Sequence, residues 1–268
     1  MVRLQPGTAG PWLGRAWSGW RGPRSIDDMT ETTIALVTGA NKGIGLAAAR
    51  RLAARPGWTV LLGSRDSTRG AEAAEGLAAD GHSAEVVELD VTSDESVAAA
   101  VKQVERAHGR LDVLVNNAGI VGARVGALET GPEELRLCYE TNVYGPVRVT
   151  RAFLPLLRRS ANPRVVMVSS GMGSLAVTTD PNRLESTLAS LAYPSSKAAL
   201  NMITSQYAKA LPEFRINAVD PGYTATDLND HHGVQTLEEG SDAVVELAGI
   251  GPDGPTGGYF DRNGPVPW

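Results

Sequence analysis

Short, almost wholly apolar segments recur along the chain from Thr33 onward, and a stretch with helical character separates each from the next. Strands that are apolar throughout are buried on both faces of a sheet. Strands that alternate with helices of this length form right-handed βαβ units around a parallel sheet. The pattern therefore predicts an α/β fold: a single doubly wound parallel sheet, Rossmann-like, with helices on both faces.

The predicted elements follow this alternation. Strands are expected at residues 34–37, 59–62, 84–89, 111–115, 164–168 and 215–219, with a last short strand at 258–260. Helices are expected at residues 46–55, 69–79, 132–140, 143–159 and 195–211. A further helix is expected from Asp94 onward, because Val97, Val101 and Val104 recur at helical spacing.

Residues 1–28 differ from the rest of the chain, because they are rich in Gly, Pro, Trp and Arg and show neither the helical nor the strand period. They lack the apolar core of a signal peptide, and their Gly and Pro content argues against an amphipathic transit peptide. We interpret them as a disordered leader, or as an upstream start with Met29 as the working initiator. Residues 29–268 are then expected to form one domain.

The net charge of −5 and the absence of a long Lys/Arg run argue against a nucleic-acid partner. No run approaches the roughly 20 apolar residues that span a bilayer. Cys138 is the only cysteine, so neither an internal disulfide nor a Cys-based zinc site is expected, and a cytoplasmic location is favoured. His231 and His232 are adjacent and lack a third ligand nearby, so no metal is expected.

A glycine-rich turn joins the first predicted strand to the first predicted helix. Its glycines let the backbone approach a pyrophosphate, and the following helix offers free N–H groups to the phosphates. A glycine cluster alone is a weak signal, but the first strand-to-helix corner is the context that dinucleotide binding requires. The loop residues expected to contact the cofactor are Gly39, Asn41, Lys42, Gly43, Ile44 and Gly45.

The end of the second strand distinguishes NAD from NADP. An NAD site places an acidic residue there for the ribose hydroxyls, whereas this chain has Gly63-Ser64-Arg65. Arg65 can form paired hydrogen bonds with a 2′-phosphate, Lys42 can add a second positive charge, and Arg69 is a weaker third candidate. These residues predict NADP(H).

Asp90 and Val91 follow the third strand and are expected beside the cofactor. Asp90 has two interpretations. It can accept a hydrogen bond from the adenine amino group, or it can cap the turn at residues 92–94.

Tyr193 and Lys197 stand at i and i+4, so they lie on one face of a helix. A free tyrosine has a pKa near ~10, and a neighbouring ammonium is expected to lower it. Such a pair can donate a proton to a carbonyl oxygen while hydride arrives at the carbon. Ser170 closes the fifth strand, where a hydroxyl can hold the substrate oxygen.

Together these residues resemble the short-chain dehydrogenase/reductase family. The matching motifs occur in the family's order: Thr38-Gly39-x-x-x-Gly43-x-Gly45, Asn116-Asn117-Ala118-Gly119, Asn142, Ser170, Tyr193-x-x-x-Lys197 and Pro221-Gly222. Within the family the chain is most similar to the monomeric carbonyl reductases, through residues 38–46, 64–66, 111–120 and 251–268.

The resemblance implies further roles. Asn117 would lie along the cofactor, and Asn142 would hold a water in a proton relay that passes through Lys197 to Tyr193. Lys197 would also hydrogen-bond the nicotinamide ribose. The residues implied to border the nicotinamide are Pro221, Gly222 and Thr226.

The chain departs from the plain family pattern between Ser170 and Tyr193, where residues 171–192 form a longer segment. Monomeric carbonyl reductases carry a still longer one, so a monomer is favoured and a homo-oligomer stays open. Met172 and Leu175 are candidates for the substrate pocket or for core and loop positions.

The leading hypothesis is an NADP(H)-dependent reductase of ketones, aldehydes or quinones. The alternatives are a 3-oxoacyl or polyketide ketoreductase and, in another class, a non-catalytic NADP(H)-binding sensor.

Overall fold

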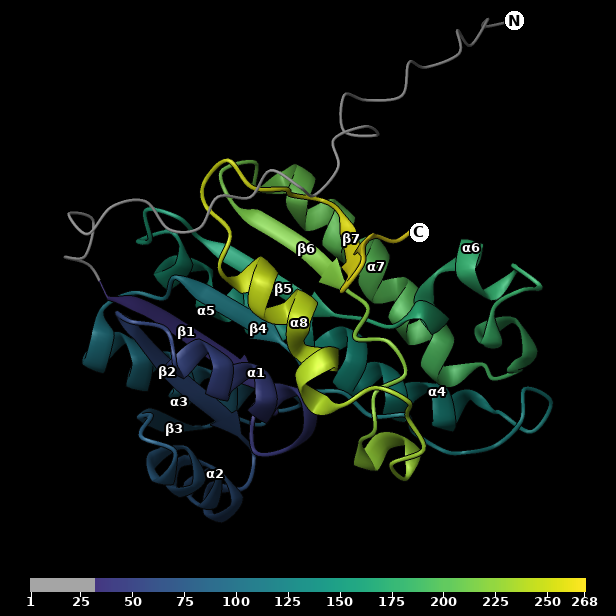
Figure 1. Cartoon of the computed structure of the whole chain (residues 1–268), viewed down its shortest axis with the longest axis horizontal. Coiled ribbons are helices and arrows are strands. Elements are labelled where there is room, and N and C mark those ends of the chain that lie inside the picture. The colour runs from purple at the N-terminus through teal and green to yellow at the C-terminus, as the bar shows by residue number, and fades with distance from the viewer. Residues whose placement is uncertain (1–31) are drawn as a thin grey trace, which may run out of the picture. The chain divides into compact units, whose positions relative to one another are not determined.

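The computed structural model describes residues 32–268, which are built around an eight-stranded sheet (Figure 1). The strand order is β3-β2-β1-β4-β5-β6-β7-β8, and every pairing from β3 to β7 is parallel. This confirms the predicted doubly wound, Rossmann-like sheet. The strands are β1 (Thr33–Thr38), β2 (Trp58–Ser64), β3 (Ala84–Glu88), β4 (Val113–Asn116), β5 (Arg164–Val168), β6 (Arg215–Val219), β7 (Tyr259–Asp261) and β8 (Gly264–Pro265).

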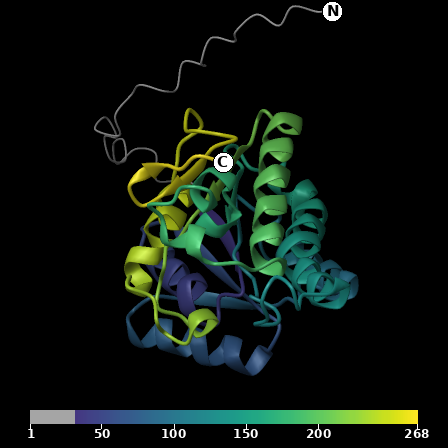
Figure 2. The same ribbon diagram turned by 90° about the vertical axis from the view of Figure 1, so that its right-hand side faces the viewer.

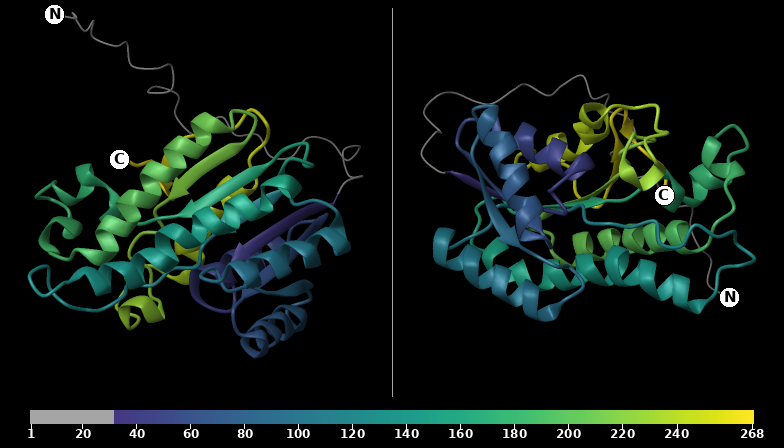
Figure 3. Two further views of the ribbon diagram at one scale, coloured as in Figure 1. Left: turned by 180° about the vertical axis from the view of Figure 1, so that it is seen from behind. Right: turned by 90° about the horizontal axis from the view of Figure 1, so that it is seen from below.

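Helices cover both faces of this sheet, as Figures 2 and 3 show. One face packs against α1, α2 and α8, and the other against α3, α5 and α7. The helices are α1 (Gly43–Ala53), α2 (Ser67–Ala79), α3 (Asp94–His108), α4 (Pro132–Tyr139), α5 (Gly145–Leu157), α6 (Leu175–Thr178), α7 (Ala192–Ala210) and α8 (Leu237–Ala248). Short helical turns are η2 (Glu140–Tyr144), η3 (Gly171–Gly173), η4 (Leu184–Thr187) and η5 (Asp227–Asn229).

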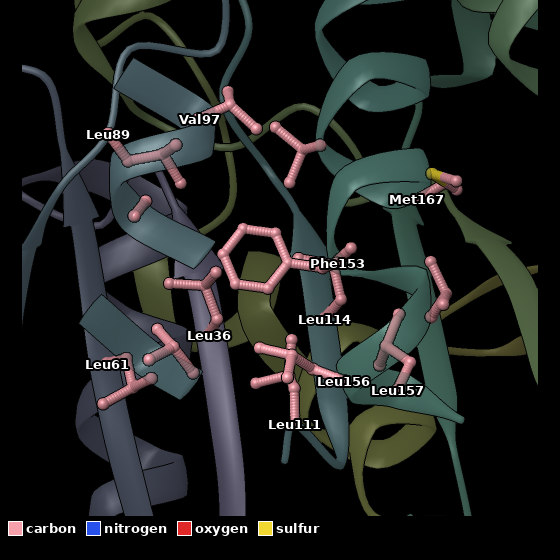
Figure 4. Close-up of a cluster of buried hydrophobic side chains, with 14 of the residues drawn as sticks. Leu36, Leu61, Leu89, Val97, Leu111, Leu114, Phe153, Leu156, Leu157 and Met167 are labelled. Atoms are coloured by element: carbon pink, nitrogen blue, oxygen red, sulfur yellow. The ribbon is translucent and has the colours of Figure 1, made fainter. Parts of the chain in front are cut away.

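The central strand β1 shows how the core is divided. Leu36 packs into the cluster beside α3 and α5, where Phe153 and Leu114 are fully buried (Figure 4). Its neighbours Ala35 and Val37 point to the other face and pack with α1 and α8. Successive side chains of a strand point to opposite faces, so a strand covered on both sides must be apolar throughout.

The edge strand β3 departs from this rule. Only Val87 of its five residues is buried, because a single neighbouring strand flanks it. The eighth strand, β8, pairs antiparallel with β7 in a short hairpin that the sequence pattern did not predict.

Several helical features were missed, and α8 and η2 are the two longest. The helix α8 was not predicted, although Thr236 and Glu239 form a capping box at its start, which is a recognisable signal. The predicted helices at 132–140 and 143–159 are in fact α4 and α5, joined without a break by the π-helical turn η2. A π-helical turn needs one extra residue in the hydrogen-bonded ring, and periodicity does not reveal it.

The predicted leader, residues 1–28, lies outside the described residues, as does Met29. Within residues 32–268, no helix is long and apolar enough to cross a membrane.

Candidate active site

The carboxyl ends of β1, β4, β5 and β6 lie next to one another, because these strands are neighbours in the sheet. The strand order reverses between β1 and β4, and ligands of doubly wound sheets bind at such a switch point. Each of these ends carries residues that the sequence singled out: the glycine-rich turn after β1, Asn117 after β4, Ser170 after β5 and Pro221-Gly222 after β6.

The glycine-rich turn packs directly against Asn117. Gly39 and Gly43 have φ angles of +64° and +58°, which side chains rarely adopt. The Asn117 Nδ2 donates to the Thr38 carbonyl at 2.8 Å, and the Thr38 hydroxyl accepts from the Asn117 backbone N–H at 2.9 Å. Asn117 therefore braces the glycine-rich turn.

Gly45 has no room for a side chain. A Cβ there would lie 2.3 Å from the Asn117 Nδ2 and 2.7 Å from the Gly39 carbonyl oxygen. Gly45→Ala is expected to destabilise the fold by about 1–3 kcal/mol, because the turn must shift. The turn's backbone is also the expected phosphate cradle, so NADPH affinity should fall as well.

Gly76→Ala is the matched control, because Gly76 lies in α2 with open space around its Cα. This change should stabilise the protein slightly, by about 0.5–1 kcal/mol, and leave NADPH affinity unchanged. Thermal unfolding and NADPH titration measure both effects. Equal behaviour of the two variants would contradict the close packing described for Gly45.

The three basic candidates for a 2′-phosphate differ in their surroundings. Arg65 is exposed just after β2 and forms no ion pair with any residue in 32–268. Lys42, in contrast, is paired with Asp227 of η5 at 2.5 Å. Arg69 is paired with Asp66 at 3.5 Å. A cavity of about 510 Å³ lies beside Asn41, Lys42, Arg69 and Asp227.

Asp90 caps the turn after β3, which is one of the two roles that the sequence left open. Its Oδ1 accepts from the Thr92 backbone N–H at 2.9 Å and from the Thr92 hydroxyl at 2.7 Å. Burial alone would raise the pKa of Asp90, but these hydrogen bonds and the charges of Arg65 and Arg148 hold it below its usual value. Val91 is buried, and a Cβ at Gly145 would lie 3.0 Å from its Cγ2.

Tyr193 stands at the start of α7 with Lys197 one turn further on. The Tyr193 hydroxyl is hydrogen-bonded to the Ser170 side chain, and the Lys197 Nζ lies 5.6 Å from the centre of the Tyr193 ring. Lys197 is buried and donates to the Val168 carbonyl at 2.8 Å. The three predicted residues are therefore brought together by α7 and the end of β5.

The expected lowering of the tyrosine pKa is not what the structure shows. Burial raises the pKa of Tyr193 to about 12, and the Ser170 hydrogen bond only partly opposes it. Burial also lowers the pKa of Lys197 to about 8. The prediction considered nearby positive charge and neglected desolvation, which penalises both the phenolate and the ammonium.

Asn142 lies in the π-helical turn η2 and is fully buried. Its Oδ1 accepts from the Ile120 backbone N–H at 2.9 Å, and its Nδ2 donates to the Ile120 carbonyl at 2.8 Å and to the Ser196 hydroxyl at 3.0 Å. A Cβ at Gly119 would lie 3.4 Å from the Asn142 Oδ1 and 3.5 Å from the Lys197 Nζ. Asn142 and Lys197 therefore border the same glycine.

Ser196 is a member of this network that sequence reasoning missed. Its hydroxyl is fully buried, accepts from Asn142 and donates to the Tyr193 carbonyl at 2.7 Å. The Cys138 thiol lies 3.5 Å from the same hydroxyl and is buried, as expected for a small apolar side chain. The only available signal was that Ser196 lies inside the Tyr193–Lys197 motif.

The segment after β6 lies at the carboxyl edge of the sheet, next to the glycine-rich turn. Gly222 has a φ of +72°, and Thr226 packs within 3.9 Å of the Cβ position of Gly43. His231 pairs with Asp227 at 3.0 Å. No cluster of three metal-ligating side chains occurs in the part of the chain that the structure describes.

The longer segment before Tyr193 is folded as η3, α6 and η4. The Met172 backbone N–H donates to the Ser170 hydroxyl at 3.3 Å, whereas Leu175 is 73% exposed. A place in the substrate pocket remains a prediction for both residues.

A glycine-rich turn at the switch point and a Tyr-Lys-Ser group at the neighbouring strand ends define the class of dinucleotide-dependent oxidoreductases. The chain matches the short chain dehydrogenase family over residues 33–236, and it belongs to this family of enzymes. It is 34% identical to (+)-neomenthol dehydrogenase of Capsicum annuum, over 88% of this chain and 98% of that protein.

Two further similarities extend over most of the chain. Salutaridine reductase of Papaver bracteatum is 33% identical, over 87% of this chain and 95% of that protein. The structure of an NADPH-bound carbonyl reductase from chicken fatty liver superposes with a TM-score of 0.78 at 27% identity, covering 89% of this chain and all of that one.

Proposed function

We propose that this enzyme uses NADPH to reduce the carbonyl group of a ketone, aldehyde or quinone to an alcohol. The observation that carries the proposal is the group of half-buried Tyr193 and Ser170 with buried Lys197 at the carboxyl edge of the sheet. The comparisons support the same reaction, since the similar proteins include a salutaridine reductase and an NADPH-bound carbonyl reductase.

The described residues fit NADP(H). In the turn at residues 38–45 no side chain covers the backbone at Gly39, Gly43 or Gly45, so a pyrophosphate could approach it closely. Arg65 is a cation without an ion-pair partner within residues 32–268, at the strand end where an NAD site has an acid. Lys42 would have to share its charge between a 2′-phosphate and Asp227.

The bound cofactor supplies the hydride that reaches the carbonyl carbon. Tyr193 then donates its proton to the carbonyl oxygen, and a phenol whose burial raises its pKa carries that proton at neutral pH. Ser170 already hydrogen-bonds the Tyr193 hydroxyl, so it can also hydrogen-bond the carbonyl oxygen that receives the Tyr193 proton. Lys197, whose pKa is lowered to about 8, is suited to return a proton toward Tyr193.

Asn142 is proposed to position this group rather than to react, because its side-chain amide already bonds Ile120 and Ser196. The remaining proposed cofactor contacts are those expected from the sequence. They are Asn41, Ile44, Asp90, Val91, Asn117, Pro221, Gly222 and Thr226.

Purified enzyme is expected to oxidise NADPH in the presence of a carbonyl panel, and to do so with a much higher kcat/KM than with NADH. The panel should contain a cyclic ketone, an aromatic aldehyde, a quinone and a 3-oxoacyl carrier protein. The last member separates the dedicated ketoreductases from the broader reductases. Tight NADPH binding with no turnover of any member would favour a non-catalytic sensor and contradict the proposal.

A further inference from the structure

A buried carboxylate lies at the candidate active site, and the sequence assigned it no role of its own. Asp220 follows β6 directly and is only 6% exposed. Val168 of β5 pairs with Val219 of β6, so the residues after these two strands lie side by side. Burial of an ionised carboxylate is costly unless hydrogen bonds or a counter-charge stabilise it.

Asp220 joins the two turns that border the catalytic edge. Its Oδ1 accepts from the Gly222 backbone N–H at 2.9 Å, and its carboxylate also accepts from the backbone N–H of Gly171, the residue after Ser170. Its Oδ2 lies 2.9 Å from the position that a Cβ of Gly171 would take. The approach is possible only because residue 171 has no side chain.

The charge of Asp220 has little compensation. It forms no ion pair with any residue in 32–268, and the nearest charges on other elements include two of the same sign, Glu185 of η4 and Asp261 of β7. Arg183 is the nearby cation, but it is half exposed and paired with Glu185 at 3.3 Å. The Tyr259 hydroxyl is buried beside this group and has no hydrogen-bond partner in the described residues.

We propose that Asp220 is a positioning residue for the carbonyl reduction: its carboxylate ties the Ser170 turn to the Pro221-Gly222 turn and keeps Tyr193 in the protonated form that donates to the substrate. The inference rests on the proposed function and adds a residue to it. A negative charge close to a phenol disfavours the phenolate, because the two anions repel each other.

The surroundings of Tyr193 agree with this role. Burial is the largest influence that raises its pKa, the Ser170 hydrogen bond opposes it, and Asp220 and then the Cys138 thiol act in the same direction as burial. The only cation described beside the ring is Lys197, whose ammonium donates to the Val168 carbonyl.

Asp220→Asn tests the proposal, because it keeps an acceptor for the Gly222 N–H and removes the charge. Reduction needs protonated Tyr193, so its kcat falls as pH rises through the Tyr193 pKa. Without the carboxylate this fall should begin about one pH unit lower, because the repulsion between the two anions is removed. Alcohol oxidation, which needs the phenolate, should gain rate at correspondingly lower pH.

Asp112→Asn is the matched control, because Asp112 is also 6% exposed and accepts from the Ile34 N–H at 2.8 Å, at the opposite end of β4. This variant should leave unchanged the pH at which kcat falls to half its maximum. Asp220→Ser removes the same charge with a different side chain and keeps the test available if the Asn variant does not fold. The role would be overturned if the neutral Asp220 variants kept the wild-type pH of half-maximal kcat, or if they lost kcat equally at every pH.

The proposed function can fail separately. If the unmodified enzyme reduces no carbonyl, the midpoint of Tyr193 can still be measured from tyrosinate absorbance, as the difference from Tyr193→Phe. An unchanged midpoint in Asp220→Asn would then refute the role of Asp220, and a lowered midpoint would support it.

Discussion

Tyr193→Phe is expected to lower kcat for carbonyl reduction by about 10²- to 10⁴-fold, because it removes only the oxygen that donates the proton. The ring and its packing beside Lys197 remain. The dissociation constant for NADPH should therefore change by less than a few-fold. Turnover with a responsive carbonyl and NADPH titration by fluorescence give the two quantities.

Tyr207→Phe is the matched control, since Tyr207 is a partly buried tyrosine on the same helix, α7, three turns beyond Lys197. It should reduce carbonyls at the wild-type rate. If Tyr193→Phe also kept the wild-type kcat, another group would be the proton donor and the proposed mechanism would be wrong.

Arg65→Asp is expected to weaken NADPH binding by about 100-fold or more, because one charge-assisted hydrogen bond contributes about 1.5–3 kcal/mol and the new carboxylate would repel the 2′-phosphate. NADH lacks that phosphate, so its affinity should fall little or even rise through the ribose hydroxyls. The ratio of kcat/KM for the two cofactors measures the effect.

The pairings of the other basic residues give graded controls. Arg69→Asp should cost less than Arg65→Asp, because Arg69 already has Asp66 as a partner. Asp227→Asn should strengthen NADPH binding modestly, since it frees Lys42 for the phosphate. Equal losses of NADPH and NADH affinity in Arg65→Asp would show that Arg65 does not contact the 2′-phosphate.

Much of the site could be predicted because its residues follow strand ends. A strand that is apolar throughout can be recognised from its own residues. The residue after it must lie at the carboxyl edge of a parallel sheet. Ser170 and Gly39 were placed in this way, and Tyr193 was placed by its helical spacing from Lys197. The helix α8 shows the limits of periodicity, since a capping box was the main signal for it.

The sequence by itself determined the doubly wound sheet, the glycine-rich turn and the identity of the catalytic candidates, because each depends on neighbouring residues along the chain. Only the tertiary structure decided that Lys42 pairs with Asp227, which is 185 positions away, and that Asp220 lies beside the Ser170 turn. It also decided that burial raises the pKa of Tyr193 to about 12 while it lowers that of Lys197 to about 8. Desolvation and long-range pairing depend on which segments meet in the folded chain, and no local pattern records that.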